Sequence, residues 1–188
     1  SADARRIARR RLPWMVFDYI DGAAGAETGA VRNRAAFDEL QFRPRVLRDV
    51  SKRDLTVSLF NGTAGAPFGI SPMGMCNLST PGADLMLARM AAAHKTPIGV
   101  STVASTSLET MIGAADGHAW FQLYISGDGS STHGLVDRAQ ACGYRTLVVT
   151  LDVPEVGRRP RELRRGFKMP FRIGPRQFVD FASFVPTP

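Results

Sequence analysis

Two polar side chains interrupt an otherwise apolar stretch near the middle of the chain. Residues 119–125 read Ala-Trp-Phe-Gln-Leu-Tyr-Ile, which is typical of a buried strand in a parallel sheet. Gln122 and Tyr124 are two residues apart, so we expect both on the same face of this strand, near its C-terminal end. An amide beside a phenol can bind a planar polar ligand. On this stretch alone, a buried polar pair that satisfies its own hydrogen bonds is an equally good interpretation.

The other candidate strands also end in polar residues. Ser71 ends the run 68–71, Ser101 lies in the run 98–102, and Thr150 and Asp152 come at and just beyond the end of the run 146–151. The carboxyl ends of parallel strands meet at one edge of a sheet, where a (β/α)8 barrel assembles its active site. The sequence therefore predicts a ligand site built from these strand ends.

The strands alternate with helices, which determines the predicted architecture. Helices are expected at 81–95, 107–115 and 131–141, giving a parallel sheet with right-handed crossovers. An open doubly wound sheet and a (β/α)8 barrel both fit. A dinucleotide-binding sheet usually carries GxGxxG after its first strand, whereas residues 71–75 read Ser-Pro-Met-Gly-Met. We therefore expect an α/β fold of the (β/α)8 type, of which only the N-terminal helices and about four βα units are present, because a whole barrel needs roughly 250 residues.

The remaining segments complete the predicted organisation. Helices are expected within 3–20 and 27–40, an extended segment at 42–47, and a short strand at 55–60 followed by an Asn61-Gly62 turn. We divide the chain into an N-terminal helical segment (1–50), the first half of a barrel (51–157) and a basic segment (158–188) that we expect to be mobile.

Composition limits the classes of protein. The 188 residues are 44% hydrophobic with a mean hydropathy of −0.08, and no apolar run approaches the roughly 18 residues that span a bilayer. The start at Ser1 suggests that the true beginning is missing, and no secretory signal is visible. Cys76 and Cys142 lack disulfide or zinc-site spacing, so we expect reduced thiols in a cytoplasmic protein with no metal site.

The net charge of +7 is unevenly distributed. Residues 1–11 and 158–176 hold 13 of the 24 basic residues. Such clusters can bind nucleic acid, an anionic membrane or an anionic small ligand, although a solvated helix face is the commonest explanation. The second cluster lies among phenylalanines, which suits an anionic membrane surface. A loop folded over the active site is an equally good interpretation of this segment.

Several segments in order resemble one family, the FMN-dependent 2-hydroxy acid dehydrogenases and oxidases, which includes glycolate oxidase, L-lactate dehydrogenase and (S)-mandelate dehydrogenase. The resembling segments are 12–19 (LPWMVFDY), 33–37 (NRAAF), 42–47 (FRPRVL), 121–124 (FQLY), 150–154 (TLDVP), 157–159 (GRR) and 166–170 (GFKMP). The resemblance implies an enzyme that oxidises an (S)-2-hydroxy acid, mandelate- or lactate-like, to the 2-oxo acid with FMN as electron acceptor.

The resemblance also implies roles for individual residues. It places Pro72, Met73 and Gly74 along the flavin. It places Ser101, Gln122 and Thr150 on the isoalloxazine ring. It places Tyr19 and Arg159 on the substrate carboxylate. Tyr124 would lie at the substrate hydroxyl, and Asp152 beside the catalytic histidine. An arginine fork suits a carboxylate, and a carboxylate beside an imidazole stabilises the imidazolium formed on proton abstraction. Taken one by one, Ser101 and Thr150 are more often structural, and an arginine within a cluster is usually a surface charge.

The sequence departs from the family pattern in two places. Met73 replaces a small or threonine residue, and Gly74 stands where typical oxidases have alanine and mandelate and lactate dehydrogenases have glycine. Gly74 favours a dehydrogenase that passes electrons to a quinone or carrier rather than to O2. The catalytic histidine belongs to the family's second half, and His94, His118 and His133 do not replace it.

The expected partners follow from the same resemblance. They are a small 2-hydroxy acid, an electron acceptor, the C-terminal half of the same enzyme, further copies of the chain in a homo-oligomer, and possible contact with the inner membrane surface, but no nucleic acid. Two alternatives remain: another flavin reaction on the same fold, and a non-catalytic half-barrel that binds nucleic acid or membrane through its arginine clusters. Residues 1–11 contain no aromatic side chain on which a base could stack, which argues against nucleic acid.

Overall fold

The computed structural model describes residues 2–60, 62–125, 129–152, 157–166 and 174–182. The chain divides into two compact units, one formed by residues 49–154 and the other by residues 1–48 together with 155–188. The segment 158–188, which the sequence separates from the N-terminal helices, thus groups with them.

The 49–154 unit contains the predicted parallel sheet. Its four strands lie in the order β3-β4-β5-β6, and every neighbouring pair is parallel. These strands are β3 (Ile70–Met73), β4 (Ile98–Ser101), β5 (Ala119–Tyr124) and β6 (Leu147–Thr150). The helices between them are α4 (Ala83–His94), α5 (Leu108–Ala114) and α6 (Ser130–Ala141), with a 3-10 turn η1 (Cys76–Leu78). A separate antiparallel hairpin joins β1 (Val57–Leu59) and β2 (Gly62–Ala64). The predicted alternation of strand and helix is confirmed.

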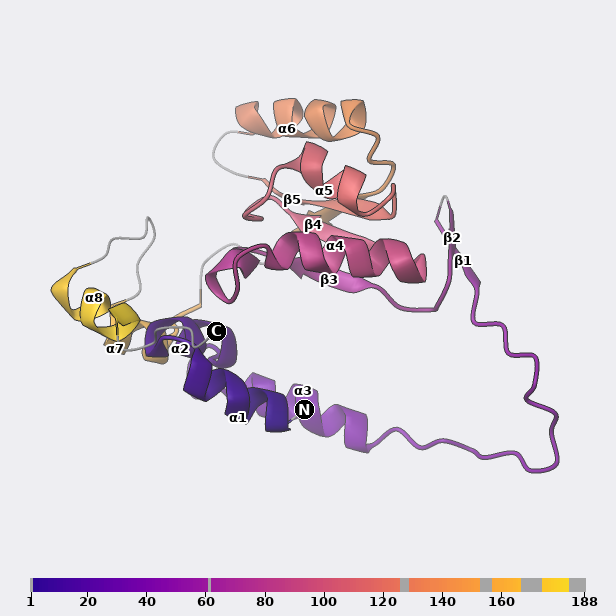
Figure 1. The fold of residues 1–188 in the computed structure, drawn as a ribbon, viewed down its shortest axis with the longest axis horizontal. Helices are drawn as coiled ribbons and strands as arrows, with labels where there is room; N and C mark the ends of the chain where they lie inside the picture. The colour runs from indigo at the N-terminus through magenta and orange to yellow at the C-terminus, as the bar shows by residue number, and fades with distance from the viewer. Residues whose placement is uncertain (1, 61, 126–128, 153–156, 167–173, 183–188) are drawn as a thin grey trace. The chain divides into compact units, whose positions relative to one another are not determined.

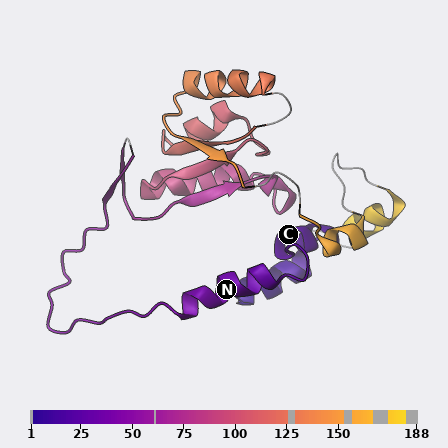
Figure 2. The same ribbon diagram turned by 180° about the vertical axis from the view of Figure 1, so that it is seen from behind.

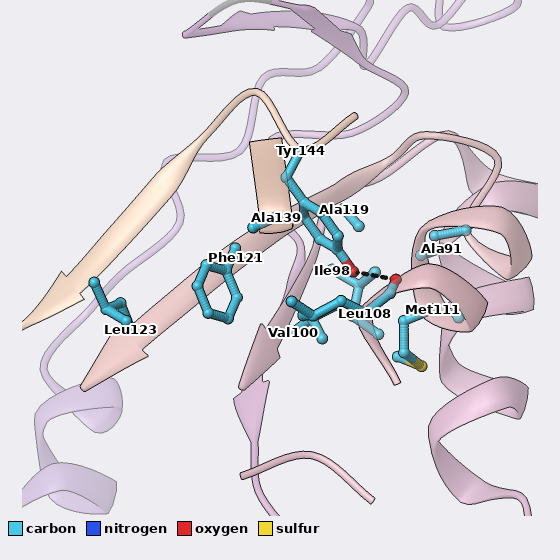
Figure 3. Packing of buried hydrophobic residues seen from close by; sticks show 12 residues of the cluster. Ala91, Ile98, Val100, Leu108, Met111, Ala119, Phe121, Leu123, Ala139 and Tyr144 are labelled. Carbon is cyan, nitrogen blue, oxygen red and sulfur yellow. Dashed lines mark hydrogen bonds between the residues drawn. The ribbon is translucent and has the colours of Figure 1, made fainter. Parts of the chain in front are cut away.

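The helices of this unit cover one face of the sheet (Figures 1 and 2). The core lies between them, where Ala91 of α4 and Met111 of α5 pack with Ile98, Val100 and Phe121 of the strands (Figure 3). Tyr144 extends this core and donates a hydrogen bond from its hydroxyl to the carbonyl of Leu108 at 2.9 Å. Because side chains alternate, the residues between these apolar positions emerge on the opposite face of the sheet.

A β-bulge changes the pairing register near the end of β3. Ile70 pairs with Ile98 and Met73 with Val100, so β3 has one residue more than β4 over this interval. Pro72 lies within the bulge, a position that tolerates its missing N–H. Gly99 lies opposite, and a Cβ there would come within 2.7 Å of Pro72 Cδ and 2.8 Å of its nitrogen. The close approach of the two strands therefore requires glycine at 99.

The other unit is helical. It contains α1 (Ala2–Arg11), α2 (Trp14–Asp21), α3 (Thr28–Asp38), α7 (Pro160–Arg165) and α8 (Pro175–Ala182). Among the described residues of this unit, the buried ones are Met15, Val16 and Phe17 of helix α2. Residues 42–47 form neither helix nor strand and are exposed, and Leu47 has a left-handed backbone with φ 54°, so the expected extended conformation does not hold at residue 47.

Helices α7 and α8 are additions to the prediction for 158–188. Pro160 starts α7, where its missing N–H costs nothing, and Gly166 ends it with φ 74°. Residues 167–173 and 183–188 of this segment lie outside the described residues. None of the described helices is long and apolar enough to cross a membrane.

Candidate active site

A hydrogen-bonded chain of three side chains crosses the carboxyl ends of β4, β5 and β6. Ser101 donates from Oγ to Gln122 Oε1 at 2.9 Å, and Gln122 Nε2 donates to Thr150 Oγ1 at 2.8 Å. Ser101 and Gln122 are 5% and 2% exposed. The predicted flavin contacts are therefore brought together on the face opposite the helices.

We call this hydrogen-bonded chain of Ser101, Gln122 and Thr150 the relay, and its hydrogen bonds have a fixed direction. The Thr102 backbone N–H also points to Gln122 Oε1, at 3.4 Å, so this amide atom is the acceptor and the Ser101 hydroxyl donates to it, while Ser101 Oγ accepts from the Val103 N–H at 3.3 Å. The Gln122 amide nitrogen then faces Thr150, whose hydroxyl accepts and keeps its own proton for a further acceptor. The relay thus presents a hydroxyl donor and the second amide hydrogen of Gln122 at its β6 end, which suits a ligand rich in carbonyl oxygens and ring nitrogens.

Thr102 joins the ends of β4 and β5 by hydrogen bonds, and the sequence analysis did not predict this contact. Its hydroxyl donates to the Gln122 carbonyl at 2.7 Å and accepts from the Tyr124 N–H at 3.1 Å. A hydroxyl residue directly after Ser101 at the end of a predicted strand is the signal that could have identified it.

The end of β3 contributes backbone to this edge. Pro72 and Met73 are exposed, with 42% of Met73 accessible, and Gly74 follows directly. A Cβ on Gly74 would lie 2.5 Å from Cγ2 of Val103, and the Met75 N–H donates to the Val103 carbonyl at 3.0 Å. Gly74 therefore allows the loop after β4 to close against the loop after β3.

The two residues predicted at the reacting atoms are accessible. Tyr124 ends β5 with 40% of its surface exposed, and Asp152, two residues beyond β6, is exposed. Cys76 is no competing nucleophile, because burial and a contact with Asp84 raise the pKa of its thiol to about 11 and keep it protonated near neutral pH.

Tyr19 and Arg159, the predicted carboxylate contacts, lie together in the helical unit. The Arg159 guanidinium lies 5.2 Å from the centre of the Tyr19 ring. Its Nη2 donates to the backbone carbonyls of Tyr19 at 2.7 Å and Gly22 at 2.8 Å. Arg159 therefore holds the C-terminal end of α2 as well as standing beside the tyrosine.

Glu162 is the acid next to this guanidinium. Its Oε1 lies 2.7 Å from Arg159 Nε, yet this buried oxygen has no hydrogen bond of good geometry among the described residues. The two groups form an ion pair without a well-aligned hydrogen bond. Burial raises the pKa of Glu162, and the positive charge of Arg159 opposes that rise.

A second ion-pair network holds α2 to its neighbours. Asp21 accepts from Arg5 of α1 and from Arg161 of α7, and Arg161 also binds Glu27 at 2.6 Å. The hydrogen bond from Arg5, with a further one from Arg161, lowers the pKa of Asp21 to about 2 against the desolvation of its carboxylate. Several arginines that looked like surface charges are therefore used in packing α1, α2 and α7 together.

The hydrogen-bond donors of Ser101, Gln122 and Thr150 fit a flavin ring. The ring's carbonyl oxygens and N5 are acceptors, and the relay offers donors at one edge of the sheet. The described histidines do not lie at that edge, since His94 ends α4, His133 lies within α6, and His118 precedes β5.

Sequence comparison identifies the family whose members this chain resembles. The sequence model of the FMN-dependent dehydrogenases matches residues 8–186. The chain is 38% identical to a putative L-lactate dehydrogenase of Mycobacterium tuberculosis and 37% identical to the (S)-mandelate dehydrogenase of Pseudomonas putida, over 95% of its own length in each case. It is also 38% identical to the 4-hydroxymandelate oxidase of Amycolatopsis orientalis over 97% of its length.

Structural comparison agrees. The crystal structure of the monotopic membrane protein (S)-mandelate dehydrogenase superposes with a TM-score of 0.88 at 36% identity, covering 97% of this chain and 49% of that one. Mandelate oxidase superposes with a TM-score of 0.83 over 90% of this chain and 49% of that one. These neighbours are (β/α)8 barrels, so the predicted fold class is confirmed. The chain spans about half the length of the curated relatives it matches, from 43% to 49% of those named above.

Proposed function

Because the chain belongs to the FMN-dependent dehydrogenase family, we propose that it contributes the N-terminal half of the catalytic site of an enzyme that oxidises an (S)-2-hydroxy acid, mandelate- or lactate-like, to the 2-oxo acid. The directed relay of Ser101, Gln122 and Thr150 carries this proposal. FMN, the cofactor of the family, supplies the two-electron acceptor when bound.

The flavin would be held by the strand ends. Thr150 and the Gln122 amide would donate to acceptor atoms of the ring, and Ser101 would keep the amide in the required orientation. The backbone of Pro72, Met73 and Gly74 would line its other side. The burial of Gln122 supports this assignment, because a buried amide held by two neighbours cannot rotate away.

The substrate would be oriented by its carboxylate. Arg159 would supply the positive charge and Tyr19 a neutral donor, and their stacked arrangement favours joint action. Tyr124 would contact the substrate hydroxyl. Asp152 would stabilise the protonated form of a histidine contributed by the part of the relatives that this chain does not cover. We propose that activity requires that part.

Gly74 favours a dehydrogenase over an oxidase that uses O2. The electron acceptor would then be a quinone or a carrier. We also propose peripheral contact with the inner membrane surface, supported by the monotopic membrane protein among the structural neighbours. A homo-oligomer is proposed from the family resemblance alone. Binding of nucleic acid by a non-catalytic half-barrel is not favoured, because the family match covers the whole of the second arginine cluster and residues 8–11 of the first.

The test is anaerobic reduction of the complete flavoprotein by the two enantiomers of lactate and of mandelate. We expect an (S)-2-hydroxy acid to bleach the flavin absorbance and its (R)-enantiomer to have no effect. Arg159→Met should lower kcat/KM by roughly ten- to more than a hundredfold, because a charge-assisted contact contributes about 1.5–3 kcal/mol. Arg158→Met next door is the matched control. Equal behaviour of the two variants, or loss of flavin from Arg159→Met, would contradict the assigned role.

A further inference from the structure

Helix α2 has no N-terminal cap of its own. Pro13 occupies the N-cap position and provides no side-chain hydrogen bond to the first turn. The first backbone N–H groups of a helix have no partner within the helix, and Ser, Thr, Asp or Asn normally supplies one from the N-cap position.

Asp180 of α8 supplies the missing cap from 166 residues away. One carboxylate oxygen accepts from the Trp14 N–H at 3.2 Å, and the other accepts from the Met15 N–H at 3.0 Å. A negative charge here also complements the positive end of the α2 dipole.

The opposite end of α2 is held in the complementary way. Arg159 donates to the carbonyls of Tyr19 and Gly22, placing a positive charge at the negative end of the dipole. An eight-residue helix is thus held at both ends by charged residues that come from α8 and from the residue preceding α7.

We propose that Asp180 is a positioning residue for Tyr19, and that α8 thereby belongs to the substrate-binding machinery. This inference rests on the proposed function, because Tyr19 is the proposed carboxylate contact. Met15, Val16 and Phe17 are buried, so α2 moves as a packed unit and a change at its first turn reaches Tyr19 on its last. The action is indirect, since Asp180 contacts α2 backbone and not the substrate.

The variants are Asp180→Ala and Asp180→Asn in the complete flavoprotein, with Asp137→Ala on the exposed surface of α6 as control. Removing a cap typically changes a local equilibrium about fivefold. We therefore expect Asp180→Ala to raise KM for the 2-hydroxy acid about five- to tenfold, with kcat within about twofold and FMN content unchanged. Asp180→Asn keeps one acceptor oxygen and should fall between the wild type and Asp180→Ala. Hydrogen exchange of a peptide containing Trp14 and Met15 should accelerate in the same order.

The outcomes separate this inference from the proposed function. A wild-type protein that oxidises no 2-hydroxy acid would overturn the proposed function and the positioning role with it. An active wild type whose Asp180→Ala variant matches Asp137→Ala in KM would overturn the positioning role alone. Faster hydrogen exchange in α2 with an unchanged KM would also overturn the positioning role, because Asp180 would then be a structural cap only. Loss of folding in Asp180→Ala leaves Asp180→Asn to decide through the same KM comparison.

Discussion

At the scale of single residues, Gln122 is the most constrained group of the candidate site. Its amide oxygen and nitrogen each have a hydroxyl partner, and the side chain is 2% exposed. Gln122→Leu fills the same space but leaves the hydroxyls of Ser101 and Thr150 without their partner. We expect the free energy of unfolding to fall by about 1–3 kcal/mol.

The same substitution should weaken FMN binding by at least about tenfold, because one flavin donor is lost and the Thr150 hydroxyl becomes free to turn. Flavin fluorescence titration of the apoprotein and denaturant unfolding measure the two effects. Gln140→Leu on the exposed surface of α6 is the matched control. Unchanged flavin affinity in Gln122→Leu would mean that the relay is structural only.

Gly74 gives a second prediction at this scale. An alanine Cβ would lie 2.5 Å from Val103 Cγ2, so Gly74→Ala should destabilise the protein by about 1–3 kcal/mol through overpacking. Gly74→Ala/Val103→Ala removes the opposing methyl groups and should recover most of that loss. Gly113→Ala on α5, where nothing lies within 4 Å, should be neutral or slightly stabilising. Thermal unfolding of the four proteins checks this, and a double variant no better than Gly74→Ala would contradict the steric explanation.

The sequence predicted that the polar residues near the strand ends would come together, because strand ends are visible in the sequence, and the structure confirms this. Their contact with a flavin stays a prediction. Ser101, Gln122 and Thr150 end apolar runs, and adjacent parallel strands must bring them together. The direction of the relay was not predictable, because it depends on the backbone N–H groups of Thr102 and Val103, which lie in the turn after β4. Asp180 was also missed. It lies in a basic segment and acts on a helix that is distant in the sequence.

At the scale of elements, alternation of strand and helix was sufficient to predict β3 to β6 and α4 to α6. Helices α7 and α8 were not predicted, because arginine and proline obscure their short patterns and their partners are more than 130 residues away. The bulge in β3 was likewise hidden, since it depends on the pairing of Pro72 with a glycine in the next strand.

The ion pairs around α2 give a prediction in acid. The pKa of Asp21 is about 2 in the folded protein against an ordinary 3.8, so its contribution to stability is fully present above about pH 4 and is lost as the pH falls toward 2. The magnitude should be below about 1 kcal/mol, because Arg5 is largely exposed. Asp21→Asn should remove this part of the pH dependence, while Asp137→Asn should keep it.

Trp14 fluorescence in a Trp120→Phe background reports on the helical unit that contains Asp21. The measurement compares the free energy of unfolding of each variant at about pH 5 and pH 3. If wild type and Asp21→Asn lost the same stability over this interval, the pKa of Asp21 would not be lowered in the folded protein, and the ion pairs with Arg5 and Arg161 would contribute nothing to stability.

At the scale of the whole molecule, the chain combines a half-barrel with a helical unit that carries the residues we propose for substrate binding. Tyr19 and Arg159, the proposed carboxylate contacts, come from the helical unit, whereas the proposed flavin contacts Ser101, Gln122 and Thr150 come from the sheet unit. Each group is held by contacts inside its own unit. Substrate binding and flavin binding should therefore be separable by mutation.

Contact with a membrane is the last prediction, and it concerns helix α8. Phe178 and Val179 are 66% and 65% exposed, while Asp180 on the same helix is engaged with α2. Apolar side chains beside a basic segment suit an anionic lipid surface, and burying a phenylalanine or valine contributes about 1.5–3 kcal/mol. Phe178→Ser/Val179→Ser should therefore reduce co-sedimentation of the complete protein with vesicles containing phosphatidylglycerol by at least about tenfold. Met86→Ser/Met90→Ser, an apolar pair on α4 that is 54% and 55% exposed, should bind as the wild type does. Equal binding by both double variants at low salt would remove α8 as the membrane contact, and equal binding to neutral and anionic vesicles would remove the role of its basic neighbours.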